Sequence, residues 1–229
     1  MIDIHTHILP DFDDGSSSEE MSFCMLKEEI EQGVREVILT PHSFSRDCKC
    51  IDKYQILSRF ETFKRRASAL PVKLSIGEEI FFSEPNFLQY FREDRFLKLG
   101  ESRYYLVEFN MEEDDCDIEN AVYDLISSGY PVILAHPERY RYMSIGLMDR
   151  LKAVGCRFQL NASSLLGGNG RRIKKLSKAM VRSGYCDFIG SDCHNLASRK
   201  PNLKEGRDYL KRTFKVDCDN ENLYHSSNF

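Results

Sequence analysis

Short apolar segments and amphipathic helical segments alternate along the chain, and this alternation constrains the fold more than any other feature. The apolar segments are rich in Val, Ile, Leu and Phe and have the length of β-strands. They lie at 1–5, 36–40, 72–77, 104–109, 131–135, 157–161 and 186–190. Helices are predicted near 18–32, 53–69, 84–92, 117–128, 146–154, 170–183 and 203–214. Seven strand–helix units are typical of a parallel α/β fold, either a barrel or an open doubly wound sheet.

The first predicted helix has clear start and stop signals. Ser17 is followed three residues later by Glu20, which is the spacing of a capping box. Gly33 follows the last apolar position and predicts the C-terminal end.

Each predicted strand ends in a polar group of residues able to do chemistry. In chain order these groups read HTH, TPH, GEE, VEF, AHPER, LNASS and GSDCH. A parallel barrel gathers all its C-terminal strand ends on one face, whereas an open sheet gathers them only at its switch point. The strand ends therefore favour a seven-stranded (β/α)7 barrel with its site on that face.

Composition excludes several other classes of protein. Of the 229 residues, 41% are hydrophobic and 30% are charged, so we expect residues 1–229 to form one domain, with a poorly ordered polar tail from about residue 217. The net charge of −4 argues against nucleic acid as the main partner. No apolar run is long enough for membrane insertion and no signal peptide is evident, so we expect a cytoplasmic protein.

The eight cysteines are scattered along the chain and form no CxxC pair. Cys48 and Cys50 form a lone CxC motif in a polar loop, which is too little for a zinc knuckle. We expect free thiols throughout.

Five of the six histidines lie at the predicted strand ends, namely His5, His7, His42, His136 and His194. His5 and His7 are two apart on a strand, so both imidazoles leave from one face and can reach a common ion.

Asp3 shares the strand face of His5 and His7 and is placed to orient one of them. Asp192 repeats the two-residue spacing with its neighbouring histidine.

Carboxylates at equivalent strand ends would supply the anionic oxygen that a cluster of dications needs. Glu108 is one of them, and spacing alone leaves open whether Asp13 or Asp14, and Glu78 or Glu79, are the others. Nine nitrogen and oxygen ligands are too many for one ion and fit two or three.

The sequence resembles the polymerase and histidinol phosphatase (PHP) superfamily, and more closely the metal-dependent tyrosine phosphatases of bacterial capsule and exopolysaccharide loci. The motifs that carry the resemblance span nearly the whole chain in family order. They are DIHTHILPDFDDGS, LTPH, GEEI, LVEF, LAHPERY, QLNASS and GSDCHN. The resemblance implies a distorted seven-stranded barrel that holds three metal ions.

The resemblance also selects the site residues. It makes Asp14 rather than Asp13, and Glu79 rather than Glu78, the ligand. The full implied ligand set is His5, His7, Asp14, His42, Glu79, Glu108, His136, Asp192 and His194. Arg139 and Arg199 would bind the phosphate as catalytic residues, and a guanidinium fork matches phosphate oxygens.

The implied activity is hydrolysis of protein phosphotyrosine by a metal-activated water, with two to three divalent ions. Manganese is preferred for a mixed imidazole and carboxylate site, and iron or zinc would also bind. The implied partner is the tyrosine-rich tail of a bacterial tyrosine autokinase that controls polysaccharide export. The alternatives are a small-molecule phosphatase of histidinol-phosphatase type and a non-catalytic regulator that binds the phosphorylated kinase.

Three sequence features remain outside this assignment. Cys193 and Arg199 have the C-x5-R spacing of thiol-dependent phosphatases, but Asp192 would raise the thiol pKa and the loop has no glycine, so we expect a buried bystander. The segment GGNGRRIKK, at 167–175, is not a P-loop, and the choice lies between a solvated helix face and a docking surface for an acidic or phosphorylated tail. The resemblance gives the 43–52 loop no role.

Overall fold

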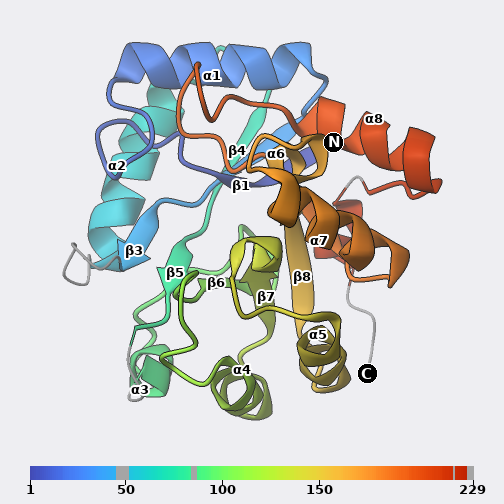
Figure 1. Ribbon diagram of the computed structural model, residues 1–229. Helices are drawn as coiled ribbons and strands as arrows, with labels where there is room; N and C mark the ends of the chain where they lie inside the picture. Colours follow the sequence, from blue (N-terminus) through green and yellow to red (C-terminus); the bar gives the residue numbers. More distant parts are fainter. Residues whose placement is uncertain (45–51, 84–86, 219, 226–229) are drawn as a thin grey trace.

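The computed structural model describes residues 1–44, 52–83, 87–218 and 220–225, and it arranges parallel strands in two sheets surrounded by helices (Figure 1). The first sheet has the order β1-β2-β4, with β1 at Ile2–Thr6, β2 at Glu36–Leu39 and β4 at Lys73–Ile76. The second has the order β3-β5-β6-β7-β8-β9. Its strands are β3 His42–Phe44, β5 Glu79–Phe81, β6 Tyr105–Glu108, β7 Val132–Ala135, β8 Arg157–Asn161 and β9 Phe188–Gly190. All ladders are parallel, which confirms the predicted fold class.

The chain passes from the first sheet to the second at two short breaks. Pro41 separates β2 from β3, and it has no amide hydrogen to continue a ladder. Gly77 and Glu78 separate β4 from β5, and a side chain at Gly77 would lie only 3.1 Å from the backbone of Leu99. The second and third predicted strands therefore correspond to β2 and β4, while β3 and β5 are two short strands that were not predicted.

Beyond β9 the chain returns to β1, where an isolated parallel bridge joins Thr6 to Cys193. The His7 amide donates to the Cys193 carbonyl (2.9 Å), and the Asp192 amide donates to the His5 carbonyl (2.9 Å). These contacts bring the two ends of the strand series together without a continuous ladder. The predicted distorted seven-stranded (β/α)7 barrel is thus not confirmed in the described residues, which form nine strands in two sheets.

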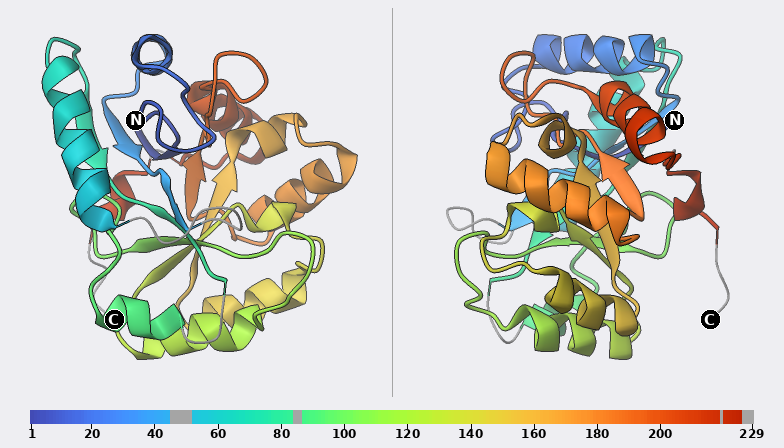
Figure 2. Two further views of the ribbon diagram at one scale, coloured as in Figure 1. Left: turned by 90° about the vertical axis from the view of Figure 1, so that its left-hand side faces the viewer. Right: turned by 45° about the vertical axis from the view of Figure 1, so that its right-hand side comes forward.

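Each predicted helical region contains a helix, and the helices lie around the outside of the strands (Figure 2). They are α1 Glu19–Glu31, α2 Lys53–Arg66, α3 Phe87–Arg92, α4 Ile118–Ser127, α5 Ile145–Ala153, α7 Arg171–Arg182 and α8 Leu203–Phe214. The short helices η1 Pro137–Arg139, α6 Ala162–Leu166 and η2 Glu221–Leu223 were not expected. The described part of the chain leaves out residues 84–86 and most of the 43–52 loop, namely 45–51. Cys48 and Cys50 lie in that omitted part of the loop.

Helix α1 begins one residue later than its sequence signal indicates. Ser18, not Ser17, is the N-cap, and its side chain accepts a hydrogen bond from the Met21 amide (3.1 Å). The end agrees with the prediction, since Gly33 has φ +87° just after the C-cap.

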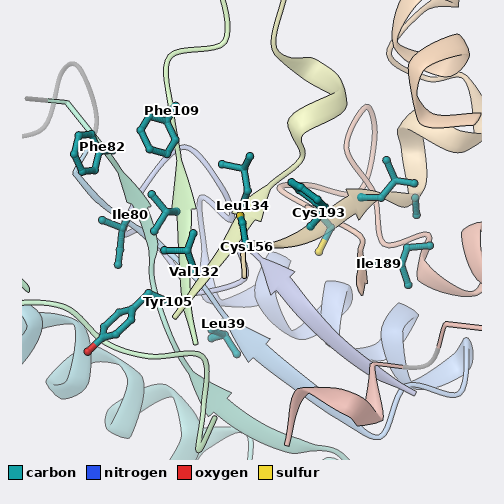
Figure 3. Close-up of a cluster of buried hydrophobic side chains, with 14 of the residues drawn as sticks. Leu39, Ile80, Phe82, Tyr105, Phe109, Val132, Leu134, Cys156, Ile189 and Cys193 are labelled. Atoms are coloured by element: carbon teal, nitrogen blue, oxygen red, sulfur yellow. The ribbon is translucent and has the colours of Figure 1, made fainter. Parts of the chain in front are cut away.

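The strands are buried on both faces, and this accounts for their nearly continuous apolar sequences. Alternate side chains of β7 enter two separate apolar clusters, Val132 and Leu134 in one and Ile133 and Ala135 in the other. Figure 3 shows part of the first cluster, in which Ile80 from β5 lies beside Val132 and Leu134 of β7.

Part of the polar tail packs on the strands. Asn220 is buried and donates to the carbonyls of Ile2 (2.7 Å) and Ile189 (2.6 Å). Leu223 is buried, and the Tyr224 hydroxyl donates to Glu36. The single-domain organisation and the poor order of the tail stay predictions.

The six cysteines in the described part of the chain are free thiols, as expected. None of the described helices is both long and apolar enough to cross a membrane.

Candidate metal centre

All nine predicted ligand residues come together at the C-terminal ends of the strands. They form four overlapping groups, and within each group the ligand atoms lie within 4.8 Å of one another. The groups are His7, Asp14, His42 and His194; His5, His7 and Asp192; His5, Glu79 and His136; and His42, Glu79 and Glu108.

Glu79 lies at the centre of the groups and faces four imidazoles. Its Oε2 is 3.2 Å from His5 Nε2, 3.1 Å from His7 Nε2 and 3.3 Å from His42 Nδ1. Its Oε1 is 2.9 Å from His136 Nε2. Burial raises the pKa of this carboxyl, but the neighbouring imidazoles lower it by a larger amount. The pKa of Glu79 therefore lies well below its usual value. An ionised carboxylate shared among several nitrogen ligands fits a bridging position between cations.

The other carboxylates lie at the edges of the cluster. Asp192 Oδ1 is 3.6 Å from the Nε2 atoms of both His5 and His7. Asp14 Oδ1 is 3.5 Å from His42 Nε2 and 3.4 Å from His194 Nε2. The Asp14 side chain is 64% exposed, so the cluster is open to solvent on this side.

The donor atoms of the buried groups are suited to bind cations. Burial lowers the pKa of His136 and that of His194 to about 4, so both imidazoles are neutral at pH 7. The buried His194 Nε2 and His42 Nδ1 lie near Asp14 and Glu79 but are not in hydrogen-bond geometry with any described residue. Burial, together with the charge of Glu79, raises the pKa of Glu108 well above its usual value. A cation bound there would have to displace the Glu108 proton.

The structure separates the two pairs of acidic neighbours that spacing leaves open. Asp14 and Glu79 each offer an oxygen to the groups, whereas Asp13 and Glu78 offer none. Asp13 Oδ2 instead lies 2.7 Å from His7 Nδ1, where it orients the ring. Glu78 is fully buried away from the groups.

Two orienting residues were missed by the sequence analysis. Gln159 Oε1 lies 3.0 Å from His5 Nδ1, and Asn161 donates from Nδ2 to Asp192 Oδ2 (2.7 Å). The available signal was the alternation of polar and apolar residues in this strand, which places Gln159 and Asn161 on one face.

Asp3, which was expected to orient an imidazole, accepts instead from the backbone amides of His5 (3.3 Å) and Ser191 (3.2 Å). It therefore holds β1 beside the segment after β9.

The two predicted phosphate-binding arginines lie against the same cluster carboxylate. Arg139 Nη1 donates to Asp192 Oδ2 (3.2 Å), and Arg199 Nη2 donates to Asp192 Oδ1 (2.7 Å). Their side chains are 23% and 36% exposed, so both reach the solvent side of the centre.

Two of the proposed ligands have a strained backbone. His136 has φ +30° and Asp192 has φ +52°, values that residues other than glycine rarely adopt. Such strain persists where surrounding contacts impose it and is common at functional sites.

Cys193 lies on the other side of its segment from the ligands. Its side chain is buried in the apolar cluster of Figure 3, with Sγ 3.9 Å from Glu29 Oε1. Burial and the neighbouring carboxylates raise the pKa of the thiol well above its usual value. A thiol in these surroundings is a poor nucleophile.

Fold and site together define a parallel α/β protein with a candidate multinuclear metal centre. Residues 1–228 match the family described as capsular polysaccharide synthesis, CpsB/CapC. CapC of Staphylococcus aureus is 34% identical over 208 residues, which cover 90% of this chain and 81% of CapC. Tyrosine-protein phosphatase YwqE of Bacillus subtilis is 31% identical over 219 residues, with 93% and 85% covered. The chain therefore belongs to the CpsB/CapC family.

Solved structures agree with this assignment. One chain comes from crystal structures of YwqE from Bacillus subtilis and CpsB from Streptococcus pneumoniae, described as unique metal-dependent tyrosine phosphatases. It matches with a TM-score of 0.87 and 30% identity, covering 94% of this chain and 88% of the other. Histidinol phosphate phosphatase from Lactococcus lactis shares the fold, with a TM-score of 0.59 and 12% identity, and the match covers 95% of this chain and 96% of the other.

Proposed function

We propose that this protein is a metal-dependent protein-tyrosine phosphatase. The observation that carries the proposal is the convergence of nine nitrogen and oxygen donors around Glu79, with two arginines at the solvent side. Its named relatives are tyrosine-protein phosphatases that match over most of this chain.

The nine donors would hold two to three divalent ions, and manganese suits their mixture of imidazole and carboxylate. Bound there, the ions would lower the pKa of a water molecule to make it a nucleophile and would offset the charge on the phosphate. Glu79 would bridge two ions, because its two oxygens face different histidines.

Arg139 and Arg199 would bind the non-bridging oxygens of the phosphate and so neutralise charge that develops during the displacement. Both guanidinium groups already lie within hydrogen-bonding distance of Asp192, at the solvent side of the centre. A phenolate is a moderate leaving group, so we assign no general acid.

The substrate would be a phosphotyrosine protein, and the capsular polysaccharide family description supports the tail of a bacterial tyrosine autokinase. A protein substrate needs an accessible centre, and the exposed Asp14 side chain supplies an open side.

Turnover on three substrates tests the proposal. Manganese-loaded protein should hydrolyse a phosphotyrosyl peptide and a simple aryl phosphate, and it should hydrolyse histidinol phosphate much more slowly. A preference for histidinol phosphate would identify a small-molecule phosphatase. Binding of the phosphopeptide without any turnover would identify a non-catalytic regulator.

A further inference from the structure

A cavity of about 550 Å³ adjoins the metal centre on the side of α7. Arg139 belongs to both, since it lines the cavity and also contacts Asp192. Phe81, at the end of β5, lines the cavity two residues after Glu79. Helix α7, labelled in Figure 1, packs against η1. Its residues Arg171, Arg172 and Ile173 line another wall of the cavity. A polypeptide bound at the centre would therefore have the cavity directly beside it.

The cavity wall is strongly basic. Arg139, Arg141, Arg171 and Arg172 line it, and Glu112 is the one acidic residue among its lining residues within the described chain. Arg141 Nε lies 2.8 Å from Glu112 Oε2, and this pair is well exposed. An anion entering the cavity would meet an excess of positive charge.

Three of the four arginines, Arg139, Arg141 and Arg172, have partners among the described residues, whereas Arg171 has none there. Arg172 donates to the carbonyls of Arg139 (3.0 Å) and Tyr140 (3.3 Å), which holds η1 against α7. Arg171 is exposed and has no hydrogen-bond or ion-pair partner among the residues that the structure describes. Its charge is therefore available to a ligand.

The start of α7 strengthens the positive potential of this wall. Gly170 is the N-cap, and no side chain caps the first amides of this 12-residue helix. The positive end of the helix dipole thus lies at the same wall as the Arg171 side chain.

We propose that this cavity binds acidic side chains that flank the phosphotyrosine in the substrate polypeptide. The inference rests on the proposed phosphatase function and adds a substrate preference to it. The arginines would pair with the carboxylates, while Phe81, Met111 and Ile173 would contact the apolar parts of the peptide.

Matched peptides measure the preference. Two phosphotyrosyl peptides differ only in carrying three glutamates or three glutamines beside the phosphotyrosine, and kcat/KM is measured for each with manganese-loaded protein. We expect the acidic peptide to be favoured about three- to fivefold at low ionic strength, because the arginines are partly exposed to solvent. The preference should disappear in high salt.

Charge variants on the cavity wall show which residues cause the preference for the acidic peptide. Arg171→Ala should reduce the preference to nearly one, whereas Glu112→Gln should increase it by freeing Arg141 from its partner. Lys178→Ala removes one charge from the same helix away from the cavity and should leave the preference unchanged. A wild-type ratio near one, or a ratio that Arg171→Ala does not change, would overturn the proposal.

Binding without turnover separates this proposal from the phosphatase proposal. The same two peptides with a non-hydrolysable phosphonate in place of the phosphate are titrated by fluorescence anisotropy. If nothing is hydrolysed but the acidic phosphonate still binds more tightly through Arg171, the docking site stands and the phosphatase proposal fails. A third peptide, with a second phosphotyrosine in place of the glutamates, tests whether the cavity binds a phosphate group instead of carboxylates. If Arg171→Ala weakens the binding of that peptide alone, the cavity recognises phosphate and the proposal of carboxylate recognition is wrong.

Discussion

At the scale of single residues, His136 and Arg139 are three positions apart and have different partners. His136 Nε2 faces Glu79, whereas the Arg139 guanidinium donates to Asp192 at the edge of the cluster. We expect His136→Ala to lose both metal and turnover. Arg139→Ala should keep its metal and lose about 100-fold or more in rate on a phosphotyrosyl peptide. Metal analysis and kinetics on the same samples make the comparison, and near-normal turnover by Arg139→Ala would contradict its assigned role.

Cys193 distinguishes a metal-dependent mechanism from a thiol-dependent one. Because its thiol is buried beside Glu29 and not at the cluster, Cys193→Ser should retain substantial activity. Chelators should silence the wild-type protein, and thiol alkylation should not. An inactive Cys193→Ser protein with a full metal complement, or a trapped phosphocysteine, would refute the metal-dependent mechanism.

Glu78 makes the stability of the fold depend on pH. Burial raises the pKa of Glu78 to about 8, against an ordinary value of 4.5. The folded state therefore holds this proton more tightly than the unfolded state, so its contribution to stability is complete below pH 4.5 and is lost as pH rises towards 8. Glu78→Gln has no proton to lose. We expect its free energy of unfolding, relative to wild type, to rise by about 1 kcal/mol or more between pH 5 and 8. Denaturant titrations at several pH values measure this difference, and a difference that stays constant with pH would contradict it.

At the scale of the elements, the start of α1 supplies a matched pair of serines. Ser18 accepts from the Met21 amide, whereas Ser17 is exposed and is not the cap. Ser18→Ala should lower the free energy of unfolding by about 1 kcal/mol because it leaves that amide without its partner. Ser17→Ala should change it by less than about 0.5 kcal/mol. Equal effects in denaturant unfolding would show that the cap is assigned to the wrong residue.

At the scale of the whole molecule, the metal centre joins strand ends that are far apart in the sequence. His5 and Asp192 come from opposite ends of the chain and lie 3.6 Å apart. Ligands that bind only the folded state stabilise it. Gently purified protein should contain two to three transition-metal ions per chain, and chelation should lower Tm by roughly 5 °C or more, reversibly on adding manganese. One ion or fewer, not restored by manganese, would rule out a multinuclear centre.

The sequence by itself predicted the order of seven of the nine described strands and of the seven longer helices, and it indicated the candidate ligands. Both are encoded locally, because apolar strands, helical periodicity and polar strand ends are patterns of neighbouring residues. Parallel strands bring their C-terminal ends to one face, so His42, Glu108 and His136 could be grouped without a structure. The choice between Asp13 and Asp14 needed a family resemblance, because two adjacent carboxylates give the same local signal.

Only the tertiary structure revealed the short strands β3 and β5 and the groups that support the ligands. Gly15 allows the tight return of the chain that places Asp14 at the cluster, since any side chain there would lie 2.2 Å from the His7 carbonyl. Gln159 orients His5 across a separation of 154 residues. The basic cavity likewise exists because α7 packs against η1. These features depend on contacts between residues that are distant in the chain, and local sequence patterns do not encode such contacts.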